Sequence, residues 1–104
     1  MEITKDAQKV IFCLYKIYLE RRKAGISKSK AVEFEEDFYK DEKSLSKLDG
    51  ETIYECLIEL KNNSYIKMDI CGNITLLNST IVYMENRFKK GLNEVVDLLT
   101  KFIP

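Results

Sequence analysis

Residues Leu60 to Glu85, LKNNSYIKMDICGNITLLNSTIVYME, are the part of the chain that says most about its fold. Their types pass from those of a helix end to those of a strand, a tight turn, a second strand and the start of another helix. Helical segments precede this stretch, and a long one follows it. The sequence therefore predicts a mainly α-helical α+β protein with one small antiparallel β-hairpin, in the order helix, helix, helix, strand, strand, helix.

Alternation of apolar and polar residues predicts the two strands. Lys67 and Asp69 separate apolar neighbours, which gives the period of two expected of a half-buried strand. A turn signal follows, because the glycine and asparagine at positions 72 and 73 both tolerate positive φ angles. Five apolar residues flank the turn: Ile66, Met68, Ile70, Ile74 and Leu76.

The length of the turn follows from the register of the strands. A three-residue loop, Cys71-Gly72-Asn73, pairs Ile70 with Ile74 and Met68 with Leu76. All five apolar side chains then lie on one face, whereas a two-residue loop would divide them between both faces. We expect the three-residue loop, with its glycine or asparagine in the left-handed conformation. The hairpin must also lie on helices, because a two-stranded ribbon alone is marginally stable.

Two helices are predicted before the third helix, which leads into the hairpin. The first runs from about Lys5 to Lys23, behind an N-cap at Thr4 and ahead of a glycine that ends it. The second begins at Ser27 or Ser29 and ends in a polar loop near Asp41. Three apolar residues would share one of its faces: Ala31, Phe34 and Phe38.

The third and fourth helices flank the hairpin. The third runs from an N-cap at Asp49 to the asparagines at 62 and 63, one of which would take the left-handed cap conformation. The fourth begins at Asn78 or Ser79 and runs to about Lys101, so that residues 79–102 form the C-terminal part of a single domain spanning 1–104. Seven apolar residues recur along it: Ile81, Met84, Phe88, Leu92, Val95, Leu99 and Phe102.

Composition excludes several classes of function. The 104 residues are 45% hydrophobic, and they contain neither a membrane-spanning run nor a signal-peptide pattern, which favours a cytoplasmic protein. The cysteines at 13, 56 and 71 have no disulfide-framework or zinc-site spacing. Histidine is absent, and no phosphate-binding loop or nucleophile elbow is present. We expect a protein that is not an enzyme and has no metal or cofactor.

Two short motifs flank the hairpin. Residues 60–66 read LKNNSYI, and residues 74–77 read ITLL. They resemble the L-x-x-x-G-Y-I and I-T-L-T-x-x-G motifs of the winged helix-turn-helix superfamily, which includes MarR-like and PadR-like proteins. Ser64 replaces the usual glycine, Leu77 replaces the usual threonine, and no glycine follows at the start of the last helix.

This resemblance implies a fold and a function. The third helix, Asp49 to Asn62, would be the recognition helix, and Tyr65 to Leu77 would be the wing. Proteins of the superfamily are usually non-enzymatic transcriptional regulators or mobile-element control proteins of bacteria and phages. They bind double-stranded DNA, often as homodimers.

Charge is segregated along the chain. Residues 21–30, RRKAGISKSK, hold five cations and no acid, whereas residues 33–42 hold six acids and one lysine. The basic block lies at the junction of the first two helices, where helix-turn-helix proteins can contact the DNA backbone. An equally weighted alternative is that these cations complement the dipole at the end of the first helix and fill a solvated loop.

The DNA-binding hypothesis assigns roles to seven residues. Two lysines of the basic block would contact phosphates, outward residues of the third helix would read bases, and a lysine on the exposed face of the hairpin would support them. The candidate residues are Lys28, Lys30, Thr52, Glu55, Lys61, Asn62 and Lys67.

An alternative hypothesis is that the chain has the winged-helix fold but does not bind DNA. The outward positions of the third helix include Glu51, Glu55 and Glu59, and the tip of the hairpin carries no lysine or arginine. Glutamates repel phosphates, and the whole chain is balanced at 17 basic and 17 acidic residues. The alternative is a protein–protein interaction module whose partner is basic.

The apolar stripe of the last helix has two interpretations. It extends further than a core of this size needs, which favours a homodimer interface built from the seven apolar residues of that helix. The simpler interpretation is that the stripe packs against the first helix of the same chain.

Overall fold

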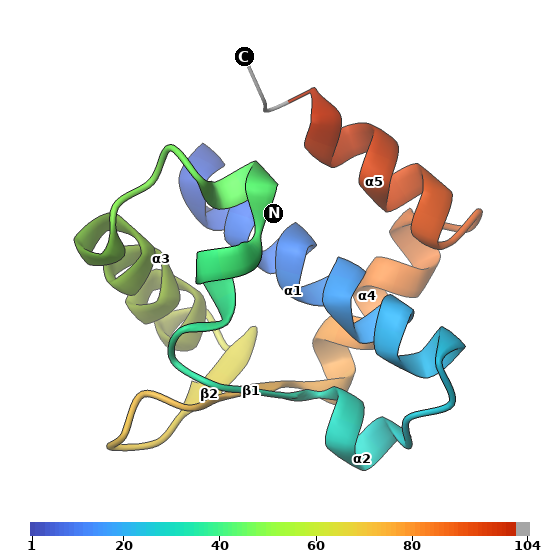
Figure 1. Cartoon of the computed structure of the whole chain (residues 1–104), viewed down its shortest axis with the longest axis horizontal. Helices are drawn as coiled ribbons and strands as arrows, with labels where there is room; N and C mark the ends of the chain where they lie inside the picture. The colour runs from blue at the N-terminus through green and yellow to red at the C-terminus, as the bar shows by residue number, and fades with distance from the viewer. Residues whose placement is uncertain (102–104) are drawn as a thin grey trace.

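Helix α1 (Lys5–Lys23) runs through the middle of the molecule, and the remaining elements pack around it (Figure 1). The computed structural model describes residues 1–101. The Thr4 side chain caps α1 by accepting a hydrogen bond from the Ala7 backbone N–H at 3.3 Å, and Gly25 follows the helix with a φ of 90°. The predicted helix and both of its end signals are confirmed.

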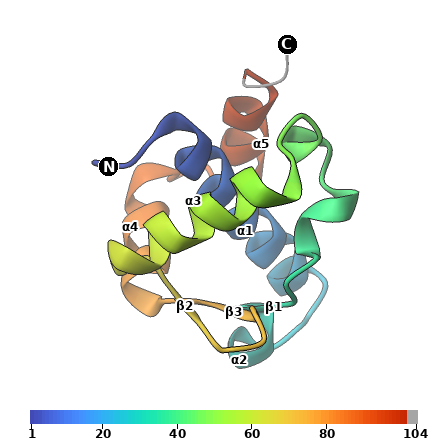
Figure 2. The same cartoon turned by 90° about the vertical axis from the view of Figure 1, so that its left-hand side faces the viewer.

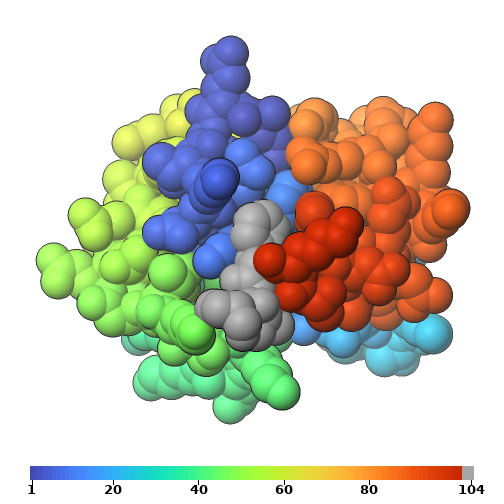
Figure 3. Space-filling model, turned by 90° about the horizontal axis from the view of Figure 1, so that it is seen from above, coloured from blue at the N-terminus to red at the C-terminus, as the bar shows by residue number. Residues whose placement is uncertain are grey.

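A three-stranded antiparallel sheet, four further helices and two short 3-10 helices surround α1 within residues 1–101. In chain order they are α2 (Lys28–Ala31), β1 (Glu33–Phe34), η1 (Phe38–Asp41), η2 (Lys43–Leu45), α3 (Gly50–Asn62), β2 (Ile66–Met68), β3 (Ile74–Leu76), α4 (Asn78–Arg87) and α5 (Leu92–Thr100). Seen from above, the start of α1 lies between α3 on one side and α4 and α5 on the other (Figure 3). The predicted mainly helical α+β class is confirmed.

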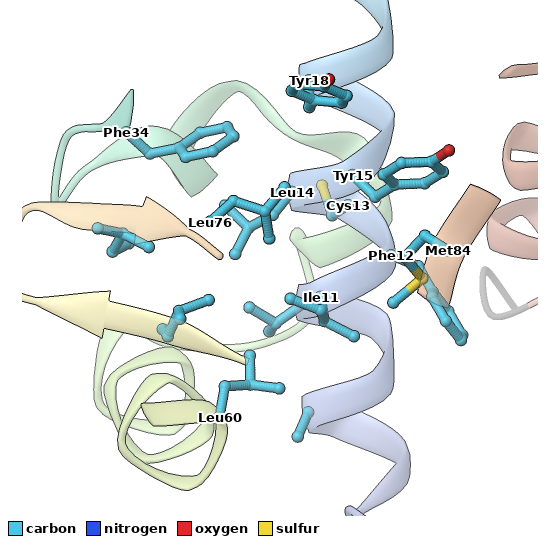
Figure 4. Close-up of a cluster of buried hydrophobic side chains, with 14 of the residues drawn as sticks. Ile11, Phe12, Cys13, Leu14, Tyr15, Tyr18, Phe34, Leu60, Leu76 and Met84 are labelled. Carbon is cyan, nitrogen blue, oxygen red and sulfur yellow. The ribbon is translucent and has the colours of Figure 1, made fainter. Parts of the chain in front are cut away.

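The core is centred on α1, which is buried on all sides along its middle. Residues 10–15 are consecutive and all buried, a pattern that an amphipathic surface helix does not show. Phe34 of β1, Leu76 of β3, Leu60 of α3 and Met84 of α4 point towards α1 from different directions (Figure 4). The central helix therefore holds the sheet and the other helices in place.

The second helix is much shorter than the sequence predicts. α2 is a single turn, Phe34 lies in β1, and Phe38 begins the separate 3-10 helix η1, so α2 does not continue to Asp41. The Leu76 N–H donates a hydrogen bond to the Val32 carbonyl at 2.8 Å, and β1 pairs with β3. The pairing provides hydrogen-bond partners for the backbone groups along the otherwise free edge of β3. Because β1 and β3 are far apart in sequence, helical periodicity could not reveal this pairing.

The sheet has the order β1-β3-β2. Its hairpin pairs Ile66 with Leu76 and Met68 with Ile74. The predicted register, in which Met68 faced Leu76, is therefore wrong by two residues. Because a shift of two residues keeps each side chain on its own face, Ile66, Ile74 and Leu76 are still buried against the helices.

The hairpin loop excludes Ile70 from the core. The Asp69 N–H donates to the Asn73 carbonyl at 3.0 Å, and the Gly72 N–H donates to the Asp69 carbonyl at 3.1 Å. The loop is therefore Ile70-Cys71-Gly72, which we name the hairpin tip, instead of the predicted Cys71–Asn73. Gly72 has a φ of 88°, which confirms it as the left-handed residue. The conformational preferences of Asp69 and Gly72 outweigh the gain from burying Ile70. Aspartate favours the first position of such a turn, and glycine favours its left-handed position.

Helix α3 begins as predicted and ends differently. The Asp49 side chain caps it by accepting a backbone hydrogen bond at 2.8 Å. At its end the Tyr65 N–H donates to the Leu60 carbonyl at 2.9 Å, and Ser64 has a φ of 63°. This is a Schellman motif with serine in the left-handed position. The predicted left-handed asparagine is wrong, since Asn63 has a φ of −98°.

The predicted single C-terminal helix is divided into two. α4 ends at Arg87 and α5 begins at Leu92, with Gly91 between them at a φ of 76°. Phe88 lies at the break and packs edge-on against Phe12 of α1, with ring centroids 5.4 Å apart. The break turns the chain so that α5 also packs against α1 (Figure 1).

Candidate macromolecular interface

The outward face of α3 is an exposed stripe of acidic and apolar residues. Glu51, Tyr54, Glu55 and Ile58 recur at spacings of three and four, which places them on one side of the helix. Tyr54 is 57% exposed, both glutamates are exposed, and Ile58 is partly buried. We name these four residues the α3 stripe. Figure 2 shows α3 lying across the face of the molecule that is towards the viewer, with the hairpin below it.

The predicted base-reading residues lie on α3, but not all in one place. Glu55 lies within the α3 stripe, whereas Lys61 and Asn62 are exposed at the C-terminal end of the helix. Thr52 is partly buried in the first turn, where its backbone N–H binds Asp49. These residues follow the length of the helix and form no compact cationic patch.

Glu59 is not available as an outward residue. Its carboxylate accepts two hydrogen bonds from Thr4, one from the backbone N–H at 2.7 Å and one from the hydroxyl at 2.8 Å. The side chain that the sequence placed on the outer surface therefore joins α3 to the start of α1.

The predicted phosphate-contacting lysines lie apart from α3. Figure 1 places α3 on the left and α2 at the lower right, with the sheet between them. The Lys28 ammonium donates a hydrogen bond to the Asn78 side-chain oxygen at 2.6 Å, which joins the start of α2 to the start of α4. Lys30 and Lys67 line the same surface groove, so the structure brings these two predicted residues together.

The groove that contains Lys30 and Lys67 has mixed charge. Glu33, Thr75 and Lys67 are aligned across the outer surface of the sheet by the strand register. The charged residues that line the groove comprise four cations and five acids: Arg21, Lys30, Lys40, Lys67, Glu33, Glu35, Asp37, Asp41 and Asp69. This balance gives the groove no net attraction for a phosphate backbone.

Two arginines of the basic block have structural roles. The Arg21 guanidinium donates to the backbone carbonyls of Ala31 and Glu33, and it lies 4.5 Å over the ring of Phe34. The Arg22 guanidinium donates to the Ile26 carbonyl at 3.1 Å. These contacts favour, for both arginines, the interpretation that the block organises the end of α1 and the chain that follows.

The predicted dimer interface is mostly occupied by the core of the chain itself. Ile81, Met84, Phe88, Val95 and Leu99 are each no more than 4% exposed. Helix α5 packs against α1, Phe88 packs against Phe12, and Met84 of α4 points towards α1 (Figure 4). Leu92 is partly buried, and Phe102 lies outside the described residues. The apolar stripe is therefore explained by packing within one chain. The exposed apolar residues of α4 and α5 are others: Val82, Tyr83 and Val96.

Two of the cysteines are buried thiols with raised pKa values. Burial, followed by the charge of Glu42, raises the pKa of the Cys13 thiol to about 12, and burial raises that of Cys56 to about 11. Such thiols stay protonated and unreactive at neutral pH. Among residues 1–101, no cluster of carboxylates and cysteines is arranged to hold a metal ion. No helix in this part of the chain has the length and apolar character needed to cross a membrane.

Sequence reasoning missed two exposed apolar residues. Ile70 is 104% exposed and Tyr54 is 57% exposed. Tyr54 lies off the buried stripe of α3, so helical periodicity contained the signal that it points outward. The signal for Ile70 was the spacing of Asp69 and Gly72, which is that of a turn.

Similarity to known proteins does not assign the chain to a family. No family model matches it, and comparisons with curated proteins and with solved structures find no match either. The surfaces of the chain are therefore the basis on which a function is proposed.

Proposed function

We propose that this chain is a non-enzymatic winged-helix protein that recognises another protein through the α3 stripe. The order of elements supports the winged-helix part of the proposal. Helix α3 is followed directly by the hairpin of β2 and β3, and a third strand, β1, pairs with β3. α3 would then stand in the place of a recognition helix, and the hairpin in the place of a wing.

The residue types of the α3 stripe indicate which kind of partner it would bind. Tyrosine is among the residues that contribute most to protein interfaces, and Tyr54 is exposed at the centre of the stripe. Glu51 and Glu55 flank it, and the stripe itself contains no cation. Acids in these positions repel DNA phosphates and attract a partner surface that carries lysine or arginine.

Double-stranded DNA is the second candidate partner. Lys30, Lys61 and Lys67 support it, because the structure gives their side chains no hydrogen bond or ion pair to any other residue in the range 1–101. In that candidate function the chain is a transcriptional regulator or mobile-element control protein, and it acts as a homodimer.

Selection from a phage-displayed library of random dodecapeptides tests the first function. Peptides selected on the chain should carry lysine or arginine together with a large apolar residue. Their affinity, measured by fluorescence anisotropy, should fall about tenfold for Tyr54→Ser, the loss typical of an interface anchor. Val82→Ser, which changes an exposed apolar residue on α4, is the matched control and should bind as the unchanged chain does.

Anisotropy on mixed-sequence duplex DNA across a salt series tests the second function. The protein-recognition function predicts no binding even at low salt. Affinity that falls steeply with salt, and that is abolished by Lys28→Glu together with Lys30→Glu, would instead establish the DNA-binding function.

A further inference from the structure

The hairpin tip presents one isoleucine from a loop held in a fixed shape. Ile70 is 104% exposed, so its side chain contacts almost nothing else in the chain. One oxygen of the Asp69 carboxylate accepts hydrogen bonds from the backbone N–H groups of Cys71 and Asn73, each at 2.9 Å. The other oxygen accepts from the Asn73 side-chain amide at 3.1 Å. With the two backbone hydrogen bonds that close the loop, these contacts hold the backbone of the hairpin tip, from which the Ile70 side chain projects.

An exposed apolar side chain on an ordered loop has the properties of a binding anchor. Binding costs conformational entropy when a loop must be ordered, and a loop that is already ordered avoids this cost. A register that buried Ile70 against Ile74 was open to this sequence, but the aspartate and glycine of the turn exclude it. The same turn residues that set the register therefore keep Ile70 in solvent.

An acidic segment lies beside the hairpin tip. Glu35, Glu36 and Asp37 are consecutive and exposed. A Cβ atom placed on Gly72 would lie 3.3 Å from both Cβ and Oε2 of Glu36, so the Glu36 side chain lies directly against the tip. Glu35 and Asp37 line the groove that Asp69 also lines. The segment that lies against the tip is therefore negatively charged, although the groove beyond it has mixed charge, and acids at this position oppose the approach of a phosphate backbone.

We propose that the hairpin tip is a second anchor for a protein partner, and that Ile70 enters an apolar pocket of the partner while Glu35, Glu36 and Asp37 pair with lysines or arginines around it. This inference rests on the proposed function and extends it, because α3 and the hairpin lie on the same face of the molecule (Figure 2). The partner segment is thus basic and apolar, and it contacts both the α3 stripe and the tip. An apolar centre with a charged rim is the usual construction of such contacts.

Three variants of the chain test the tip with peptides selected from the dodecapeptide library. Ile70→Ser should weaken binding about tenfold without unfolding the chain, because the side chain it removes is fully exposed. Glu35→Gln, Glu36→Gln and Asp37→Asn combined in one chain should weaken binding and reduce its dependence on salt. Val82→Ser again serves as the control with an exposed apolar residue far from the tip.

The outcomes separate this inference from the function on which it rests. If peptide affinity falls for Tyr54→Ser but is unchanged by Ile70→Ser, the tip is not an anchor and the α3 function stands. If no peptide depends on either residue, both proposals are wrong. If duplex DNA binds and Ile70→Ser weakens that binding, the tip is an apolar wedge for nucleic acid, and a protein partner at the tip is excluded.

Discussion

The Glu59 carboxylate of α3 accepts hydrogen bonds from both the backbone N–H and the hydroxyl of Thr4, at 2.7 and 2.8 Å. The same hydroxyl accepts a hydrogen bond from the Ala7 N–H and so caps α1. One glutamate therefore orients the N-cap of the central helix from an element 55 residues away. The surface of α3 thus divides into a structural part at Glu59 and an open part at the α3 stripe.

Removing this contact should destabilise the fold. Glu59→Ala leaves the Thr4 N–H and hydroxyl without their acceptor, and we expect the free energy of unfolding to fall by about 1–2 kcal/mol. Urea denaturation followed by circular dichroism measures the change. Glu55→Ala is the matched control, since it removes an exposed glutamate of the same helix, and it should change stability by less than about 0.5 kcal/mol. Equal losses in the two variants would show that the Thr4 contact contributes nothing.

Replacing Ser64 by glycine should stabilise the chain. Ser64 has a φ of 63° at the end of α3, a conformation that costs a residue with a side chain more than it costs glycine. We expect Ser64→Gly to raise the free energy of unfolding by about 0.5–1 kcal/mol. Ser46→Gly is the opposite case, because Ser46 is exposed with a φ of −63°, and it should lower stability. A destabilising Ser64→Gly would contradict the assignment of strain to this residue.

Two adjacent valines of α5 should respond differently to truncation. Val95 is 0% exposed and Val96 is 36% exposed. Val95→Ala should cost about 2 kcal/mol of stability, and Val96→Ala much less. If the apolar stripe of α5 is only core, the thermal midpoint should not change with protein concentration. A midpoint that rises with concentration would show self-association, and its loss in Val96→Ser would place the contact on the exposed side of α5.

The buried thiols should make the chain less stable at alkaline pH. The pKa of Cys13 rises from 9.0 to about 12 through burial and the charge of Glu42, and that of Cys56 rises to about 11 through burial. Above about pH 9 the unfolded chain releases these protons while the folded chain keeps them, so stability present below that pH is lost as the pH rises towards 12. Denaturant midpoints at pH 8 and pH 10 measure this loss.

Cysteine variants assign the effect to its source. Cys13→Ala should reduce the difference between the two midpoints, whereas Cys71→Ala should leave it unchanged because Cys71 is exposed. A thiol reagent at pH 8 should modify Cys71 rapidly and Cys13 only on unfolding. Rapid modification of all three cysteines in the folded chain would show that Cys13 and Cys56 are not buried.

The candidate interface could be read from the sequence only in part. Sequence patterns predicted that α3 is acidic and that the hairpin tip lacks cations. They also placed Glu59 among the outward glutamates, because its hydrogen bond to Thr4 joins residues that no local pattern relates. Lys28 has its own partner in Asn78, which likewise comes from a distant element. Which polar side chains are free for a partner depends on contacts between elements.

Elements whose signals are local could be placed from the sequence alone. Thr4 and Gly25 bound α1, Asp49 begins α3, and alternation identifies both strands of the hairpin, because caps and periodicity act within a few residues. Contacts between distant segments set the helix ends that local patterns did not show. Pairing of β1 with β3 limited α2 to one turn, and packing of α5 on α1 divided the last helix. Both outcomes depend on backbone hydrogen bonds and apolar contacts between segments far apart in the chain, whose gain outweighs local helical preference.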